Sequence, residues 1–118
     1  APAGGLPKAL GGGMRQAGVL AAAGVEVLED WAATEERLRG EHELAKALAS
    51  GLSLIDGVDA PPPETNLVYL SVPPPLSAAA VAAALSERGV LVGPVGERRI
   101  RAVVHRDVGG EGVAAAVA

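Results

Sequence analysis

The chain has 118 residues, of which 49% are apolar and 20% are charged, and its net charge is −4. It contains no cysteine, which excludes disulfides, thiolate catalysis and cysteine-ligated metal sites. No uninterrupted apolar run reaches the roughly 18 residues of a membrane span, and an isoelectric point near 5.1 argues against a generic nucleic-acid binder. The length fits one domain or a piece of a larger protein, and the start at Ala1 favours a processed chain or an excerpt.

Alanine supplies much of the apolar content, and phenylalanine is absent. Burial contributes about 25 cal/mol per Å² of apolar area, and an alanine side chain offers little area. We therefore expect a thin core that is stabilised by a partner surface.

The first ten residues predict irregular structure, because they include two prolines and two glycines. They lack the charged start and the apolar run of a signal peptide. Three glycines at 11–13 then precede a helical pattern over residues 14–28. Apolar or small residues occupy nearly every face of this pattern, which is typical of a buried helix.

A second helix is predicted over residues 34–52. The face expected to be buried carries Leu38, Ala45, Leu48 and Leu52. The other face pairs Glu35 with Arg39 and Glu43 with Lys46, at spacings that bring opposite charges together. The three prolines at 61–63 that follow predict a rigid connector.

The apolar, β-branched segment 66–72 predicts a strand between turn residues. Ser77 is placed to cap a helix that runs to Arg88. Gly89 follows where a left-handed residue is favoured. Residues 90–92 predict a brief strand.

Segment 98–105 predicts another strand, in which alternate side chains face opposite sides. One face is expected to carry the core residues Ile100, Ala102 and Val104, and the other carries Arg99, Arg101, Val103 and His105. A final helix is expected from Gly110 to Ala118. The order of elements predicts an α/β fold of the small α+β type, in which two long helices lie on one side of a small mixed or antiparallel sheet.

Lys8, Arg15 and the glycine run between them form the first candidate site. A helix N-terminus binds phosphate or carboxylate through its free N–H groups and its partial positive charge. The alternative is a glycine-rich loop that only lets two segments approach closely, and the spacing matches no Walker loop or dinucleotide fingerprint.

Arg101 forms the second candidate site. A strand holds its guanidinium rigidly, and that group binds carboxylates in a bidentate manner. The alternative is a solvated sheet face on which Arg101 is paired with a nearby acidic residue.

The remaining chemically active residues predict no site. His42 has no converging ligands for a metal, so a solvent-facing or capping role is expected. Trp31 and Tyr69 are expected to anchor packing. The only lysines, Lys8 and Lys46, lack an obviously desolvated setting that would favour Schiff-base chemistry.

Four segments carry a further signal, and they are residues 10–24 (LGGGMRQAGVLAAAG), 37–52, 65–68 (TNLV) and 101–108 (RAVVHRDV). Together they resemble the low-specificity L-threonine aldolases, which are pyridoxal-phosphate lyases of fold type I. The first segment is similar to the family's entry into its small domain and the second to its second helix. The third resembles a T-N-x-V strand, and the fourth resembles an R-x-V-T-H-x-D-V segment. The resemblance therefore implies a chain with an irregular segment 1–10 and a C-terminal small domain over residues 11–118, without the large cofactor-binding domain.

The resemblance implies roles at three positions. Arg101 would hold the substrate carboxylate, and Lys8 and Arg15 would reach the cofactor phosphate of a neighbouring subunit. His42 and His105 match family positions but are assigned no catalytic role. Two departures from the family pattern are Val104 in place of threonine and Arg106 in place of an apolar residue.

The family's Schiff-base lysine lies before this chain begins, so no catalytic residue and no metal site is assigned within it. The leading hypothesis is that the chain is the C-terminal part of an enzyme that cleaves L-threonine or L-allo-threonine with pyridoxal phosphate. The complete enzyme is expected to be cytoplasmic and homo-oligomeric (a tetramer in the family), and this chain alone is expected to be inactive. Its partner is then a small amino-acid substrate, with no nucleic acid and no membrane. The alternatives are a non-catalytic oligomerisation or interaction module, and a degraded remnant of the family.

Overall fold

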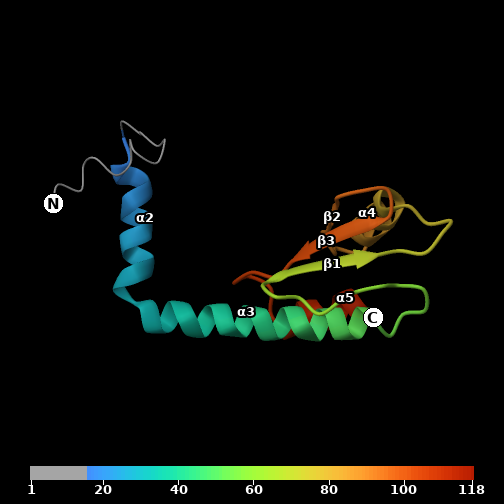
Figure 1. Ribbon diagram of the computed structural model, residues 1–118, viewed down its shortest axis with the longest axis horizontal. Helices are drawn as coiled ribbons and strands as arrows, with labels where there is room; N and C mark the ends of the chain where they lie inside the picture. Colours follow the sequence, from blue (N-terminus) through green and yellow to red (C-terminus); the bar gives the residue numbers. More distant parts are fainter. Residues whose placement is uncertain (1–15) are drawn as a thin grey trace. The chain divides into compact units, whose positions relative to one another are not determined.

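The computed structural model describes residues 16–118 (Figure 1), and the chain divides into two compact units, the first of which ends at Thr34. The expected irregular segment 1–10, the glycine run at 11–13 and the candidate residues Lys8 and Arg15 lie outside the described residues. No helix between residues 16 and 118 is both long enough and apolar enough to cross a membrane.

Helix α2 (Gly18–Glu29) is the main element of the first unit. It begins at Gly18 after a turn at residues 16 and 17, and the predicted start at residue 14 lies outside the described residues. None of its residues is buried, and its large apolar side chains Val19, Leu20, Val25, Val27 and Leu28 are all exposed. The prediction of a buried helix is therefore wrong for this chain by itself, because the described part of the first unit contains only α2 and the first turn of α3.

Helix α3 (Trp31–Leu52) begins three residues before the predicted position 34. Asp30 causes the earlier start, because its Oδ1 accepts a hydrogen bond from the backbone N–H of Ala33 at 3.1 Å, as an N-cap does. Trp31 is 52% exposed, so its predicted role as a packing anchor is wrong.

The second unit contains a three-stranded antiparallel sheet in the order β1-β3-β2. Strand β1 (Leu67–Ser71) pairs with the central strand β3 (Arg99–Val103), which also pairs with the short strand β2 (Gly93–Pro94). The predicted alternation of β3 is confirmed, because Ile100 and Ala102 are buried while Arg99, Arg101 and Val103 are exposed. The sheet is antiparallel throughout.

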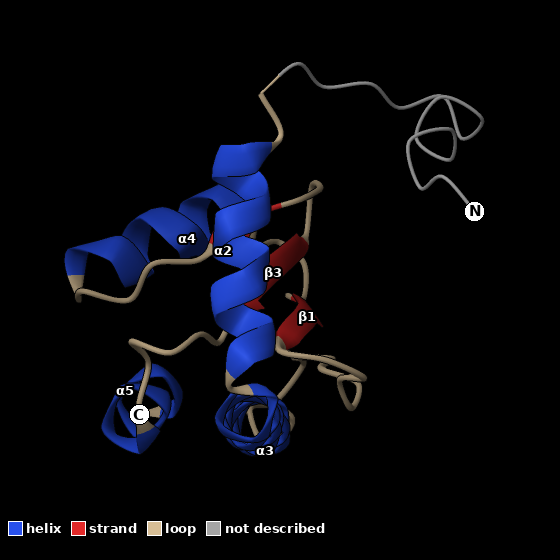
Figure 2. Ribbon diagram, turned by 90° about the vertical axis from the view of Figure 1, so that its left-hand side faces the viewer, coloured by secondary structure: helices blue, strands red, loops and turns tan. Residues whose placement is uncertain are grey.

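One face of the sheet carries the core. The C-terminal half of α3 and helix α5 (Gly110–Val117) contribute to a cluster with Val68, Ala102 and Val104. A second cluster joins Leu70, Val72 and Ile100 to Ala60 and to Ala78, the first residue of α4. Between residues 16 and 118 alanine supplies five of the twelve buried apolar residues, which confirms the thin core expected from composition. Helices α3 and α5 lie side by side (Figure 2), and a Cβ on Gly51 would lie 2.8 Å from the Val117 methyl carbons.

The charged face of α3 is confirmed, because Arg39 pairs with Glu35 at 2.9 Å and Lys46 pairs with Glu43 at 2.8 Å. The buried face is confirmed for Ala45 and Leu48 but not for Leu38, which is exposed. Leu38 lies before the part of α3 that contacts the core, so nothing in the second unit covers it.

Helix α4 (Ala78–Glu87) has the ends that the sequence predicts. Ser77 Oγ accepts a hydrogen bond from the N–H of Ala80 at 3.2 Å, and Gly89 has a φ of +81°. The strand predicted at 90–92 is wrong, since β2 comes later, at Gly93–Pro94. Val90 donates its N–H to the carbonyl of Leu85 and so still belongs to the helix end, which delays strand pairing.

Candidate functional site

The face of the sheet opposite the core is open. Alternation along β1 and β3 places Leu67, Tyr69, Ser71, Arg99, Arg101 and Val103 on this face, and none of the six is buried. The central strand β3 carries Arg101, so hydrogen-bonded strands on both sides fix the backbone beneath this side chain. We call these six residues the open face.

Arg101 is the candidate ligand-binding group of the open face. Its guanidinium forms no ion pair with any carboxylate of residues 16–118, whereas Arg37, Arg39 and Lys46 all form such pairs on α3. The alternative in which Arg101 is paired with a nearby acidic residue therefore has no support within the described chain. A cation held on a strand without a partner is suited to an external carboxylate.

Tyr69 lies directly across from Arg101 in the β1–β3 register. Its ring is covered by the guanidinium of Arg99, which lies 4.7 Å from the ring centroid, within the range of a cation–π contact. Tyr69 is half-buried on the open face, so the packing role that the sequence predicts for it is met by the contact with Arg99 and not in the core. The sequence analysis missed this contact, although the two-residue spacing of Arg99 and Arg101 already places both arginines on one face.

Gly93 lies across from Arg101 on the other side, on the edge strand β2. A Cβ placed there would meet only the carbonyl oxygen of Arg101, at 3.9 Å, which is an ordinary contact. The fold therefore places no side chain directly across from Arg101 on the β2 side, whereas Tyr69 lies across from it on the β1 side. An anion can approach the guanidinium from the β2 side.

His105 follows β3 and is exposed. Its Nδ1 accepts a hydrogen bond from the backbone N–H of Asp107 at 3.3 Å, and Asp107 Oδ2 lies 3.7 Å from the same nitrogen. In this arrangement Nδ1 is an acceptor, so the neutral ring carries its hydrogen on Nε2. The contact holds the turn after β3.

His42 is half-buried on α3, and its Nε2 lies 3.2 Å from the carbonyl oxygen of Pro63 in the proline connector. The predicted solvent-facing or capping role is therefore wrong, since the ring links α3 to this connector. No group of three or more His, Asp or Glu side chains in the part of the chain that the structure describes could hold a metal ion.

Lys46 is exposed and donates a hydrogen bond to Glu43 Oε1 at 2.8 Å. This hydrogen bond and the positive charge of Lys46 lower the pKa of the Glu43 carboxyl. An exposed, ion-paired amine is a poor nucleophile near neutral pH. The prediction that Lys46 lacks a desolvated setting is confirmed.

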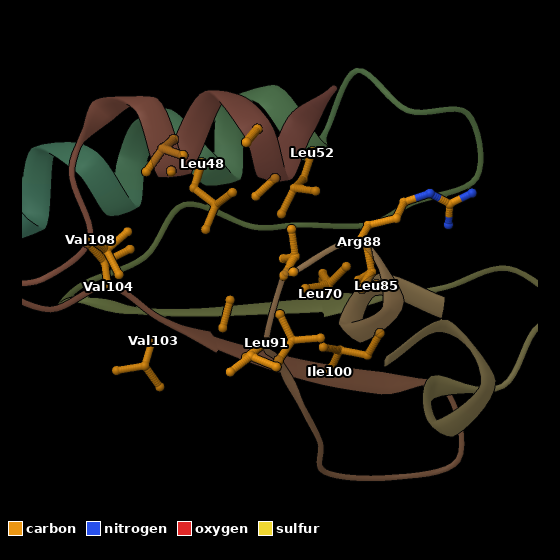
Figure 3. A pocket seen from close by; sticks show the side chains of 18 residues that line it. Leu48, Leu52, Leu70, Leu85, Arg88, Leu91, Ile100, Val103, Val104 and Val108 are labelled. Atoms are coloured by element: carbon orange, nitrogen blue, oxygen red, sulfur yellow. The ribbon is translucent and has the colours of Figure 1, made fainter. Parts of the chain in front are cut away.

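A cavity of about 270 Å³ lies on the core side of the sheet, between α3, α5 and the end of α4. Leucine, isoleucine and valine side chains project into it (Figure 3), and Arg88 is the one charged residue among the described residues that line it. The guanidinium of Arg88 points away from these apolar side chains. The cavity shares only Val103 with the open face, and within residues 16–118 its lining offers no group for acid–base or nucleophilic chemistry. Nothing in the sequence predicted it.

The chain matches the beta-eliminating lyase family over residues 2–73. It is 40% identical over 107 residues to an Arabidopsis thaliana protein named "Probable low-specificity L-threonine aldolase 2". This match covers 87% of the chain and 29% of the relative, so the chain spans about three tenths of that protein's length.

Two solved structures share the fold. A cystine C-S lyase, C-DES, in complex with cysteine persulfide, is superposed with a TM-score of 0.64 at 24% identity, over 71% of this chain and 23% of that one. The α-aminoadipate aminotransferase LysN of Thermus thermophilus, complexed with N-(5'-phosphopyridoxyl)-L-leucine, gives a TM-score of 0.58 at 24% identity, over 77% and 27%. The predicted fold class, a small α/β domain like that of fold type I pyridoxal-phosphate enzymes, is confirmed.

Proposed function

The chain belongs to the beta-eliminating lyase family, and on this basis we propose that it forms the C-terminal part of a pyridoxal-phosphate-dependent, threonine aldolase-like lyase. The complete enzyme cleaves the bond between Cα and Cβ of L-threonine or L-allo-threonine and releases glycine and acetaldehyde. The 40% identity to a relative with that name supports the substrate class. In the complete enzyme this part supplies substrate binding, and the reacting lysine comes from a segment outside it.

Arg101 binds the α-carboxylate of the amino-acid substrate in this proposal. The observation that carries it is an arginine on the central strand of the open face, without an acidic partner among residues 16–118. Two parallel hydrogen bonds from the guanidinium fix both oxygens of a carboxylate, and so orient the bonds at the adjacent Cα. Glycine at position 93 leaves the approach to Arg101 open from the β2 side.

The residues of this chain suit a supporting role toward the cofactor. Lys8 and Arg15, which flank the glycine run at 11–13, would hold the phosphate of a neighbouring subunit, as the family resemblance implies. Lys46 is exposed and bound to Glu43, so it is unsuited to carry the cofactor. When bound, pyridoxal phosphate acts as an electron sink for the carbanion formed at Cα.

A carboxylate titration of the 118-residue chain tests the role of Arg101. Propionate is added at constant ionic strength, and the Nε–H signals of all arginines are followed by NMR. We expect the largest shift at Arg101, and we expect Arg101→Gln to abolish saturable binding while Arg106→Gln, a matched loss of one charge, retains it. Equal small shifts at all exposed arginines would overturn the assignment.

The chain alone is inactive in this proposal, because the cofactor lysine and the large domain belong to the part of the enzyme outside it. Purified chain is incubated with pyridoxal phosphate and L-threonine, and the release of glycine and acetaldehyde is measured. We expect no release above the rate of pyridoxal phosphate without protein. Release by the chain that is lost in Arg101→Gln would show that the chain holds a complete site.

Helix α2 supports a homo-oligomer, and also the second candidate, a non-catalytic interaction module. Its five large apolar side chains are exposed, with Val19 at 79% and Leu20 at 63%, and an apolar surface of this kind promotes association. Sedimentation velocity over a concentration series tests the association. We expect oligomers in the parent chain and a monomer in Leu20→Glu, with Glu26→Gln on the same helix as the control. Oligomers that neither bind carboxylate nor respond to pyridoxal phosphate favour the module, and a monomer at every concentration contradicts both.

A further inference from the structure

The open face carries two arginines in two different states. Arg99 and Arg101 are two residues apart on β3, so their Cα atoms lie roughly 7 Å apart and their side chains leave the sheet on the same side. The guanidinium of Arg99 lies over the Tyr69 ring, 4.7 Å from its centroid, whereas that of Arg101 has no ionic partner among residues 16–118. Neither arginine has an ionic partner among residues 16–118, but Arg99 is held in position by the ring, whereas no such contact holds Arg101.

Tyr69 is the residue that makes the two arginines differ. It faces Arg101 across the β1–β3 ladder and lies diagonally opposite Arg99, whose own register partner is Ser71. A serine side chain is too short to hold a guanidinium over the sheet, so the aromatic ring is the contact that draws Arg99 toward β1. A cation–π contact at an exposed site favours the stacked arrangement by about twofold to fivefold.

We propose that Tyr69 makes the Arg101 site selective for amino acids with a single carboxylate, by holding Arg99 on its ring. The inference rests on the proposed function of Arg101 as the carboxylate ligand. With Arg99 stacked, its guanidinium is restrained over the ring, and only Arg101 is free to turn toward a carboxylate. With Arg99 released, a second cation on the same face, two residues away, can bind the second carboxylate of an acidic substrate. Tyr69 is thus a positioning residue that acts through Arg99 and does not itself contact the substrate carboxylate.

The test compares propionate with succinate, which is propionate with one further carboxylate on its terminal carbon. Both are titrated into the 118-residue chain at constant ionic strength, with the Arg101 Nε–H signal as the readout. The ratio of succinate to propionate affinity is the measured quantity, because the statistical advantage of two carboxylates is the same in every variant and cancels. In Tyr69→Leu we expect this ratio to rise by about 1.5-fold to fivefold, the range of one additional exposed ion pair.

Three further variants separate the contact from a merely structural effect. Tyr69→Phe keeps an aromatic face and is expected to keep the parent ratio. The double variant Tyr69→Leu, Arg99→Gln lacks the released cation and is expected to return to the parent ratio. Arg98→Gln removes one neighbouring positive charge and is expected to leave the ratio unchanged. The Arg99 Cδ protons report the stacking directly, with an upfield ring-current shift in the parent chain and in Tyr69→Phe.

The outcomes distinguish this inference from the function it rests on. An unchanged ratio in a folded Tyr69→Leu variant, or an increase that persists in the double variant, overturns the role of Tyr69 while Arg101 remains the carboxylate site. The absence of a ring-current shift at Arg99 in the parent chain overturns it as well. Failure of the parent chain to bind propionate at Arg101 overturns the proposed function itself.

Discussion

Gly57 and Gly89 offer a matched test of the backbone in the second unit, because both have positive φ values, +77° and +81°. An added Cβ in this left-handed region costs about 1–2 kcal/mol. The reduced entropy of the unfolded chain offsets about 0.4–1 kcal/mol of this cost. Around Gly89 a Cβ would meet nothing within 4 Å, so Gly89→Ala should lower the free energy of unfolding by up to about 1.6 kcal/mol.

Gly57 carries a second cost, from close packing. A Cβ there would lie 2.9 Å from Cγ and 3.0 Å from Cβ of Pro73, and the proline ring cannot rotate away as a flexible side chain would. Overpacking of this kind costs about 1–3 kcal/mol. Gly57→Ala should therefore lower the free energy of unfolding by about 1–3 kcal/mol more than Gly89→Ala does.

Urea unfolding followed by circular dichroism measures both variants, with the slope m compared to verify that the same transition is seen. The double variant Gly57→Ala, Pro73→Ala removes Cγ and Cδ of the ring but keeps Cβ, so it should recover part of the additional loss. Equal losses for Gly57→Ala and Gly89→Ala, or no recovery in the double variant, would refute the packing argument.

Three other predictions concern the site's scaffold and charges. Asn66→Ala removes the 2.7 Å hydrogen bond from Nδ2 to the Val104 carbonyl, so the free energy of unfolding measured in urea should fall by about 1 kcal/mol. A variant as stable as the parent chain would contradict this prediction. Ile100→Ala empties a fully buried position behind the open face and should cost about 2–5 kcal/mol, so a loss below 1 kcal/mol would show that the core collapses around it. Lys46 lowers the pKa of Glu43 in the folded chain. The pair therefore stabilises the fold at pH values above the pKa that Glu43 has in the unfolded chain. This stabilisation is lost as the pH falls through the lower pKa of the folded chain. Lys46→Met should raise the Glu43 pKa in an NMR titration, and an unchanged value would contradict the cause assigned here.

Local chemistry explains most of what the sequence predicted correctly. The alternation of β3 follows from the two-residue period of a strand. This period alone predicts that Arg101 lies on the face opposite the core. Ser77 and Gly89 marked the ends of α4 because capping depends on residue type and a few neighbouring backbone groups. The ion pairs of α3 follow from the helical spacing alone.

The features that the sequence analysis missed depend on contacts between distant segments or on covering surfaces. The shift of β2 to Gly93–Pro94 depends on how far the α4 end extends through the Val90 hydrogen bond. The Arg99–Tyr69 contact joins residues 30 positions apart, and only the register of β1 and β3 brings them together. The exposure of α2 could not be predicted from the sequence. An apolar pattern shows that a helix has a surface to bury, but it does not show whether that surface packs against the same chain or against another one.

In the proposed function this chain binds the substrate carboxylate but does not carry the cofactor. An absorbance titration of the purified chain with pyridoxal phosphate, followed by borohydride reduction and peptide mapping, tests this claim most directly. We predict no single-site adduct, because Lys46 is exposed and ion-paired, and Lys8 belongs to the proposed phosphate site. Stoichiometric reduction at one lysine, Lys8 or Lys46, would contradict the account and place the reacting amine within this chain.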